Sequence, residues 1–422
     1  MSEERVKQIA VIAGLSSPAL RADENSDEAS LAELAALVET AGGEVAARVL
    51  QNRSTPDVRT FLGEGKAEEL RELIAAHEAD LLVLDNEISP AQTRALSELC
   101  DCAVLTRSGI ILDIFAGRAR TAEGKLQVEL AQYKYILPRL AGQGTALSRL
   151  GGGIGTRGPG ETKLETDRRH IRGRMHRLEE ELQHLSAVRE QQRRARQKNS
   201  VPVVALVGYT NAGKSTLMNR ITEAGIPANN RLFDTLDMTT RAFEPEAGMP
   251  ALLSDTVGFI RRLPHSLISS FEATLSELKY AEMLLHVIDC ADPEMEAHIR
   301  VTEALAADMA KEDTPILRVY NKADLAPAEL RRDPEGIYIS AATGEGIDEL
   351  LAKIAQQLKG TRRAFEFLIP YSDGAALNLL YRDGRVENVE HGETGVSVRA
   401  VCDAKLYAAV QKYDVRGGGQ NG

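Results

Sequence analysis

Residues 201–215 read VPVVALVGYTNAGKS, and this stretch decides the fold of the central part of the chain. The apolar run VVALV leads directly into a glycine loop, and the segment STLMNRIT after the loop is predicted to be a helix. This is the P-loop pattern, in which backbone N–H groups and a helix N-terminus surround phosphate groups. We predict that Lys214 contacts the β- and γ-phosphates and that the Ser215 hydroxyl binds Mg²⁺. The predicted nucleotide contacts of the loop are Gly208, Tyr209, Thr210, Asn211, Ala212, Gly213, Lys214 and Ser215.

A second motif follows about forty residues later, where the predicted strand ALLSD ends in a D-x-x-G sequence. An Asp at a strand end suits a water-mediated contact with Mg²⁺, and the glycine N–H suits the γ-phosphate. Alone this motif is common in turns, but its distance from the P-loop makes it specific. The predicted contacts are Asp255, Thr256, Val257 and Gly258.

Two further motifs select the base. In the N-K-x-D sequence after the strand ILRVY, the Asp324 carboxylate can accept two hydrogen bonds from guanine that adenine cannot supply, and the Asn321 amide can reach the other edge of the base. A backbone N–H of residues 340–342, after the strand IYIS, can meet the guanine oxygen. The order of all four motifs predicts a P-loop domain that binds GTP and GDP. The predicted base contacts are Asn321, Lys322, Ala323, Asp324, Ser340, Ala341 and Ala342.

The segment FDTLDMTTR, between the P-loop and Asp255, has the composition of a switch loop, in which a Thr hydroxyl binds Mg²⁺. Spacing alone leaves Thr235, Thr239 and Thr240 open as that ligand. The predicted nucleotide contacts here are Phe233, Asp234, Thr235, Leu236 and Asp237.

Residue 259 is Phe, where Ras-like GTPases carry a Gln that orients the attacking water. We therefore expect slow intrinsic GTP hydrolysis that a macromolecular partner accelerates, and we assign no catalytic residue. Arg241, Arg261 and Arg262 are the arginines near enough to be considered as a finger in cis. Asn211 either makes hydrogen bonds within its loop or helps to bind K⁺ beside the phosphates, and the sequence leaves both open.

The rest of the chain divides into three further parts. Residues 1–115 alternate strands and helices, which predicts a parallel α/β domain, and residues 116–200 predict a helical hairpin with a glycine-rich tip. The stretch LDIFAGRARTAEGKLQVELAQYKYILPRL in this region is expected to form one extended helix. Residues 201–360 form the GTPase domain, and residues 361–422 form a small α+β C-terminal domain. The predicted fold class is therefore multidomain α/β.

Composition sets limits on the partners. The chain has 422 residues with a net charge of −11, but residues 156–200 hold twelve Lys and Arg against seven acids, so this segment is a candidate polyanion contact. The alternative is a solvated helix face. The four cysteines form no C-x-x-C pair, and the sequence shows no leader, apolar span or lipidation motif. We expect a reduced, cytoplasmic protein, a monomer without stable membrane insertion.

Several stretches together resemble the HflX family of translational GTPases, within the Obg–HflX branch. They run over nearly the whole chain, and they are FLGEGKAEEL, LLVLDNEISPAQTRAL, LDIFAGRARTAEGKLQVELAQ, RGPGETKLETDRR, FDTLDMTTR, DTVGFIRRLP and NKAD. The family switch motif F-A-T-L-D-P-T-T-R implies that Thr235 is the Mg²⁺ ligand. Here Asp234 replaces Ala and Met238 replaces Pro, which puts the nucleotide-exchange behaviour in doubt.

The resemblance also implies a partner. Family members bind the large ribosomal subunit, reach its 23S rRNA through the N-terminal domain and hairpin, and split stalled or idle 70S ribosomes in the GTP state. The candidate rRNA contacts are Arg157, Lys163, Arg168 and Arg169. The alternative function is a nucleotide-dependent module that remodels rRNA during ribosome biogenesis. Family members are also reported to use ATP through the N-terminal domain, although this domain has no P-loop of its own.

Overall fold

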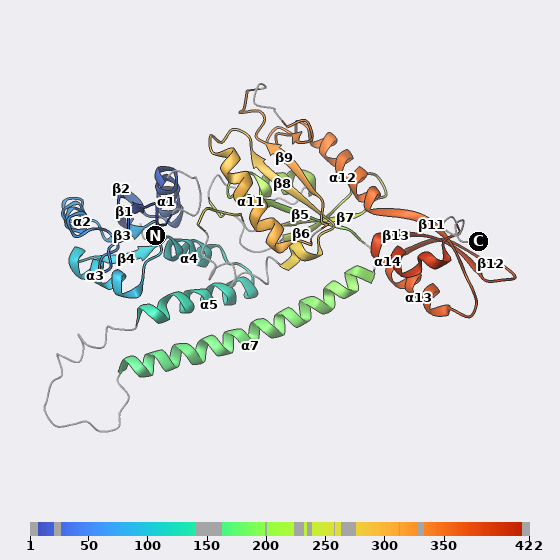
Figure 1. Ribbon diagram of the computed structural model, residues 1–422, viewed down its shortest axis with the longest axis horizontal. Coiled ribbons are helices and arrows are strands. Elements are labelled where there is room, and N and C mark those ends of the chain that lie inside the picture. The colour runs from blue at the N-terminus through green and yellow to red at the C-terminus, as the bar shows by residue number, and fades with distance from the viewer. Residues whose placement is uncertain are drawn as a thin grey trace, which may run out of the picture. The chain divides into compact units, whose positions relative to one another are not determined.

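A computed structural model describes residues 7–20, 27–140, 163–198, 201–222, 232–233, 239–256, 258–262, 276–311, 313–327 and 333–415. The chain forms two compact units. Figure 1 labels their helices and strands. The first unit comprises residues 1–185, 229–237 and 257–274, and the second comprises residues 186–228, 238–256 and 275–422. Each unit is described by itself below.

The first unit is built on a parallel four-stranded sheet with the order β2-β1-β3-β4, as the alternation of strands and helices predicts. Nearly every residue of β1 and all four of β3 are buried, which is typical of parallel strands covered on both faces. The elements are β1 (Ile9–Ser16), α1 (Asp27–Ala41), β2 (Glu44–Asn52), α2 (Glu64–Ala76), β3 (Leu81–Leu84), α3 (Pro90–Cys100), β4 (Ala103–Thr106), α4 (Arg107–Arg118) and α5 (Ala122–Arg139).

The predicted single helix over residues 112–140 is wrong, because the structure has two helices there. α4 ends at Arg118, and Ala119 has an extended backbone with φ −61° and ψ 113°. Thr121 then begins α5 as an N-cap, since its hydroxyl accepts a hydrogen bond from the Gly124 N–H at 2.9 Å. The break allows α4 to bury most of its length in the N-terminal domain, while only part of α5 is buried.

The predicted pairing of two helices in the hairpin is confirmed. α5 contacts the first half of α7 (Lys163–Lys198) through an ion pair in which Arg174 donates to both carboxylate oxygens of Glu129, at 2.8 and 2.9 Å. A second ion pair joins Lys134 to Glu179. The glycine-rich tip lies outside the described residues.

The second unit contains the GTPase domain, a six-stranded sheet with the order β10-β9-β8-β5-β7-β6. Its strands run parallel except for β6, which pairs antiparallel with β7. The elements are β5 (Val203–Gly208), α8 (Lys214–Thr222), β6 (Thr239–Phe243), β7 (Ala251–Asp255), a short 3₁₀ helix η1 (Ser276–Tyr280), β8 (Met283–Asp289), α11 (Met295–Met309), β9 (Ile316–Asn321), β10 (Ile337–Tyr338) and α12 (Ile347–Thr361).

The C-terminal domain is a separate antiparallel sheet with the order β11-β13-β12 and its own core of buried side chains. Phe367, Leu380 and Val398 lie at the centre of this core and are fully buried. The elements are β11 (Arg362–Ile369), α13 (Gly374–Asp383), β12 (Arg385–His391), β13 (Val396–Asp403), α14 (Ala404–Val410) and the 3₁₀ helix η3 (Gln411–Tyr413).

The helices that the structure describes include none with the length and apolar character needed to cross a lipid bilayer.

Candidate functional site

The P-loop connects β5 to α8, at the carboxyl edge of the parallel strands of the GTPase sheet. This edge is where open α/β sheets bind their ligands. Two glycines of the loop have no room for a side chain. A Cβ on Gly208 would lie 2.3 Å from the Val287 carbonyl oxygen, and a Cβ on Gly213, whose φ is +95°, would lie 2.2 Å from the Asn321 amide nitrogen. The loop therefore packs directly on β8 and on the N-K-x-D segment.

Lys214 is buried, and its ammonium donates to the carbonyl oxygens of Gly208 and Tyr209 at 3.0 and 2.8 Å. Burial lowers the pKa of Lys214 to about 8, and the nearby Asp255 carboxylate acts in the opposite direction. A lysine held in this way lies within the phosphate-binding loop, close to where the motif predicts that phosphates bind.

The two predicted Mg²⁺-associated side chains of this unit lie together. The Ser215 hydroxyl donates to the Asp255 carboxylate at 2.9 Å. Hydroxyl and carboxylate oxygens are the hard donors that Mg²⁺ prefers, and they leave coordination positions for phosphate oxygens and water. The residues present therefore fit the predicted Mg²⁺ ion. Thr256, the next residue, uses its hydroxyl to bond the Leu206 carbonyl oxygen at 2.6 Å, which joins the ends of β7 and β5.

Asn321 holds the nucleotide motifs together. Its amide nitrogen donates to the Ala212 carbonyl oxygen at 2.8 Å, and its amide oxygen accepts from the Ala341 N–H at 2.9 Å. Arg220 of α8 bonds the carbonyl oxygens of Ala341 and Ala342 from the other side. Both functional atoms of the Asn321 amide are thus used between protein loops, so the side chain positions the P-loop and the 340–342 loop relative to each other.

The remaining base-selecting residues have the accessibility that their predicted roles need. Asp324 is exposed, and Ala323 is buried beneath it. Lys322 has a left-handed backbone with φ +64°, and its ammonium pairs with the Asp289 carboxylate at 2.6 Å. The sequence motifs do not include Asp289. It ends the buried strand β8 at the same sheet edge, and an Asp at the end of a buried strand is a pattern that the sequence shows.

A second contact that the motifs did not predict supports the P-loop from α11. The Tyr209 ring stacks on the His298 ring with the centroids 3.6 Å apart, and His298 Nδ1 lies 3.2 Å from an Asp292 carboxylate oxygen. Both partners come from the segment that follows β8, so the loop is held by side chains as well as by its own backbone.

Two of the three threonines that the sequence leaves open as the Mg²⁺ ligand of the switch loop lie in a β-strand. Thr239 and Thr240 lie in β6, where Thr239 pairs with Asp255 and the Thr240 hydroxyl lies 3.2 Å from the Ser254 hydroxyl. Thr240 is therefore committed to the sheet. Residues 234–238, which include Asp234, Thr235, Leu236 and Asp237, and residue 257, which is Val257, lie outside the described residues.

Phe233 of the first switch segment and residues 258–262 of the second belong to the first unit. The Phe233 ring is buried and meets the Phe115 ring of α4 edge-on, with the centroids 4.9 Å apart. Phe259, next to Gly258, is also buried. Arg262 is paired with Asp27 and Asp85 of the N-terminal domain.

Two of the four candidate rRNA-contacting side chains are described. Arg168 is half-buried and Arg169 is exposed, both on the first third of α7. Lys163 is the first residue of this helix, and Arg157 lies outside the described residues.

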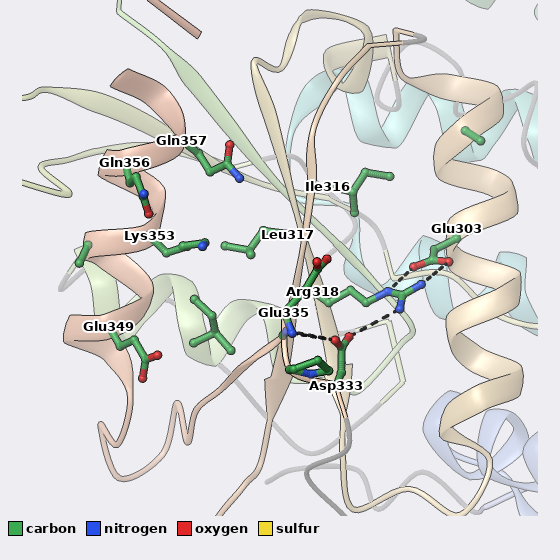
Figure 2. Close-up of a pocket in the computed structure, with 15 residues that line it drawn as sticks. Glu303, Ile316, Leu317, Arg318, Asp333, Glu335, Glu349, Lys353, Gln356 and Gln357 are labelled. Carbon is green, nitrogen blue, oxygen red and sulfur yellow. Dashed lines mark hydrogen bonds and ion pairs between the residues drawn. The ribbon is translucent and has the colours of Figure 1, made fainter. Parts of the chain in front are cut away.

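Figure 2 shows a groove on the GTPase domain between α11, β9 and α12, away from the nucleotide motifs. Arg318 crosses it and forms ion pairs with Glu303 and Asp333. The pKa of Glu303 is lowered to about 2, by the nearby His286 and by the Arg318 guanidinium. The lining holds four carboxylates (Glu303, Asp333, Glu335 and Glu349) against two basic side chains (Arg318 and Lys353), so it is net acidic and does not present the positive charge that a triphosphate requires.

The comparisons with known proteins agree with this geometry. Four family models match consecutive parts of the chain: "GTP-binding GTPase N-terminal" at residues 28–116, "GTP-binding GTPase Middle Region" at 118–196, "50S ribosome-binding GTPase" at 203–322 and "HflX C-terminal domain" at 328–410.

Curated relatives cover nearly the whole chain. A protein of Caldanaerobacter subterraneus named GTPase HflX is 47% identical over 90% of this chain and 89% of its own length. The proteins of the same name from Lacrimispora saccharolytica and Escherichia coli K12 are 45% and 43% identical, over 97% and 89% of this chain and 96% and 91% of their own lengths.

Proposed function

Because the chain belongs to the HflX family of GTPases, we propose that it binds the large ribosomal subunit and uses GTP to split or recycle stalled and idle 70S ribosomes. The observation that carries this proposal is the series of four consecutive family matches between residues 28 and 410, which includes a ribosome-binding GTPase model over the complete P-loop.

The GTP cycle would act as follows. Residues 208–215 bind the phosphates, Ser215 and Thr235 bind Mg²⁺, and Asp324 selects guanine. Mg²⁺ supplies charge neutralisation at the β- and γ-phosphates. Phe259 leaves the attacking water without an amide to orient it, so hydrolysis is slow until the ribosome contributes.

We also propose that K⁺ stimulates GTP hydrolysis by this protein. Asn211 is exposed at the P-loop with φ +63°, where its amide oxygen can reach a cation beside the phosphates. The test compares GTP hydrolysis in KCl and in NaCl at equal ionic strength. A higher rate in KCl is expected, and equal rates would remove K⁺ from the proposal.

Sedimentation tests the proposed function. Purified 70S ribosomes are mixed with the protein and GTP, a non-hydrolysable GTP analogue or GDP, and subunits are separated on sucrose gradients. Subunit release and co-migration with the large subunit are expected with either triphosphate and not with GDP. Binding to rRNA without any release of subunits would favour the alternative role in rRNA remodelling.

The rRNA contact has a separate test. We propose that Arg157, Lys163, Arg168 and Arg169 contact rRNA phosphates, and replacing all four with Ala should weaken binding to the large subunit. Each lost phosphate contact should also reduce the slope of log affinity against log salt by about 0.7–0.9. The control replaces four exposed basic side chains outside the N-terminal domain and the hairpin, Lys359, Arg382, Arg399 and Lys412. Equal losses in both variants would refute the assignment.

A further inference from the structure

A stacked pair of rings connects the P-loop to α11. Tyr209 is the second residue of the loop, and its ring lies within 10° of parallel to the His298 ring, with the centroids 3.6 Å apart. Tyr209 is 7% exposed and the His298 side chain is 15% exposed, so the contact is largely closed to water. Because the ring of Tyr209 packs against a fixed surface, the peptide that carries it is restrained as well.

The His298 ring is itself fixed by the start of α11. Its Nδ1 lies 3.2 Å from one carboxylate oxygen of Asp292. The other oxygen of that carboxylate accepts a hydrogen bond from the Glu294 N–H at 2.9 Å, and the Glu294 carbonyl oxygen accepts from the His298 N–H at 3.1 Å. The imidazole is therefore bonded to the same turn through both its side chain and its backbone.

The segment that leads from β8 to this turn is anchored to the N-K-x-D motif. The Asp289 carboxylate pairs with the Lys322 ammonium at 2.6 Å, and the Cys290 N–H donates to the Asn321 carbonyl oxygen at 3.0 Å. The residues from Asp289 to His298 thus form a continuous support between the base-selecting motif and the P-loop. A support that is bonded at both ends can hold a loop in one position.

On the loop side, the restrained peptide contacts the phosphate-binding lysine. The Tyr209 carbonyl oxygen accepts from the Lys214 ammonium at 2.8 Å and from the Ala212 N–H at 3.3 Å. The Gly208 carbonyl oxygen is the second printed acceptor of the ammonium, at 3.0 Å. The motif assigns Lys214 to the β- and γ-phosphates. Since these carbonyl oxygens hold the ammonium, a displaced Tyr209 peptide would displace it too.

We propose that His298 is a positioning residue for phosphate binding. It holds the Tyr209 ring, and the Tyr209 carbonyl in turn holds the Lys214 ammonium where the β-phosphate binds. The effect is confined to nucleotides that carry a β-phosphate, because the guanine end of the site is built from other residues. The proposal rests on the GTP and GDP binding of this family and does not depend on ribosome splitting, so either can fail without the other.

Displacement of fluorescently labelled GDP from the full chain, without ribosomes, measures the affinities for unlabelled GDP and GMP. His298→Ala should weaken the binding of GDP by about twofold to tenfold, the range expected for the loss of one aromatic pair. The affinity for GMP should stay the same, because GMP lacks the phosphates that Lys214 meets. An unchanged affinity for GDP, or an equal loss for GDP and GMP, would overturn the proposal, since a purely structural role predicts no difference between the two nucleotides.

Two replacements at the same position separate the ring from its polar atoms. His298→Phe keeps a ring without the bond to Asp292 and should retain most of the affinity for GDP. His298→Asn keeps a polar group without a ring and should be as weak as His298→Ala. If the asparagine variant binds GDP like the wild type, or the phenylalanine variant is as weak as His298→Ala, the role assigned to the stacked rings is wrong.

Tyr209→Ala completes a double-mutant cycle. If His298 acts through Tyr209, adding His298→Ala to Tyr209→Ala produces no further loss of GDP affinity, whereas fully additive losses would contradict the proposal. Arg300→Ala is the matched control, because Arg300 is exposed on the same helix two residues further on and its removal should leave the affinity for GDP unchanged. Circular dichroism and the melting temperature establish that each variant is folded.

Discussion

Replacing Asp85 with Asn should destabilise the N-terminal domain strongly, although the change keeps the shape of the side chain. Asp85 accepts from Arg107 on one oxygen, and from Ser30 and Arg262 on the other. An Asn places an NH₂ group where one of these oxygens stood, so at least one donor faces another donor. The buried Arg107 then loses the charge of one partner, while its ion pair with Glu33 remains.

The expected loss of stability follows from the burial of the ion pair between Arg107 and Asp85. Breaking a buried ion pair by removing one partner costs about 3–5 kcal/mol, and the remaining Glu33 contact places this case near the lower end, at about 3 kcal/mol. For a unit of this size, each kcal/mol lowers the melting temperature by about 2–4 °C. The N-terminal transition should therefore fall by about 6–12 °C.

Differential scanning calorimetry of the full chain measures this change. Added GDP raises the transition of the GTPase domain and identifies it, because a ligand stabilises only the unit that it binds. Asp101→Asn is the matched control: Asp101 is exposed with a left-handed backbone at φ +50°, which Asn also tolerates. If Asp85→Asn lowers the N-terminal transition no more than Asp101→Asn, the reasoning about the buried network is refuted.

Three further results are expected. Asn321→Ala should weaken GDP binding about tenfold in isothermal titration calorimetry, because a buried bond to Ala212 worth about 1–2 kcal/mol is lost; unchanged affinity would contradict this. Asp324→Ala should lower the preference for GTP over ATP at least about tenfold in competition assays, since the guanine N–H groups lose their acceptor; a retained preference would place base selection elsewhere. In Glu303→Gln, the free energy of unfolding should fall less steeply as the pH is lowered, because the pKa of Glu303 in the folded chain is about 2 against an ordinary 4.5. Its ion pair with Arg318 thus stabilises the fold above pH 4.5 and is lost as the pH falls from 4.5 towards 2, so an identical curve for the variant would contradict this assignment.

Local patterns predicted most of the fold and the nucleotide motifs. Residues close together in the chain specify the P-loop strand, the N-K-x-D sequence and the βα alternation. These features can therefore be identified from the sequence alone. The break between α4 and α5 was missed although Thr121 is a good N-cap, because the apolar periodicity continues across it.

Contacts between distant residues were not predictable in the same way. Arg107 and Ser30 are separated by 77 residues, and Arg262 and Asp27 by 235, so only the folded topology brings them together. The motif predicts Asn321 at the guanine edge, which stays a prediction; that its amide also joins two loops was not predictable, because an amide bonds a peptide group as well as a base. A motif identifies a candidate residue, but only the tertiary structure shows which groups its side chain contacts.

The cross-links from Asn321 and Arg220 have a consequence for which nucleotide the protein carries in a cell. They preassemble the base end of the site, which meets the part of the molecule that GDP and GTP share. Affinity arising there is equal for both and shifts no equilibrium between them. Discrimination between GDP and GTP is therefore left to the residues that meet the γ-phosphate, and a substitution at the base end should change the affinities for both nucleotides by the same factor.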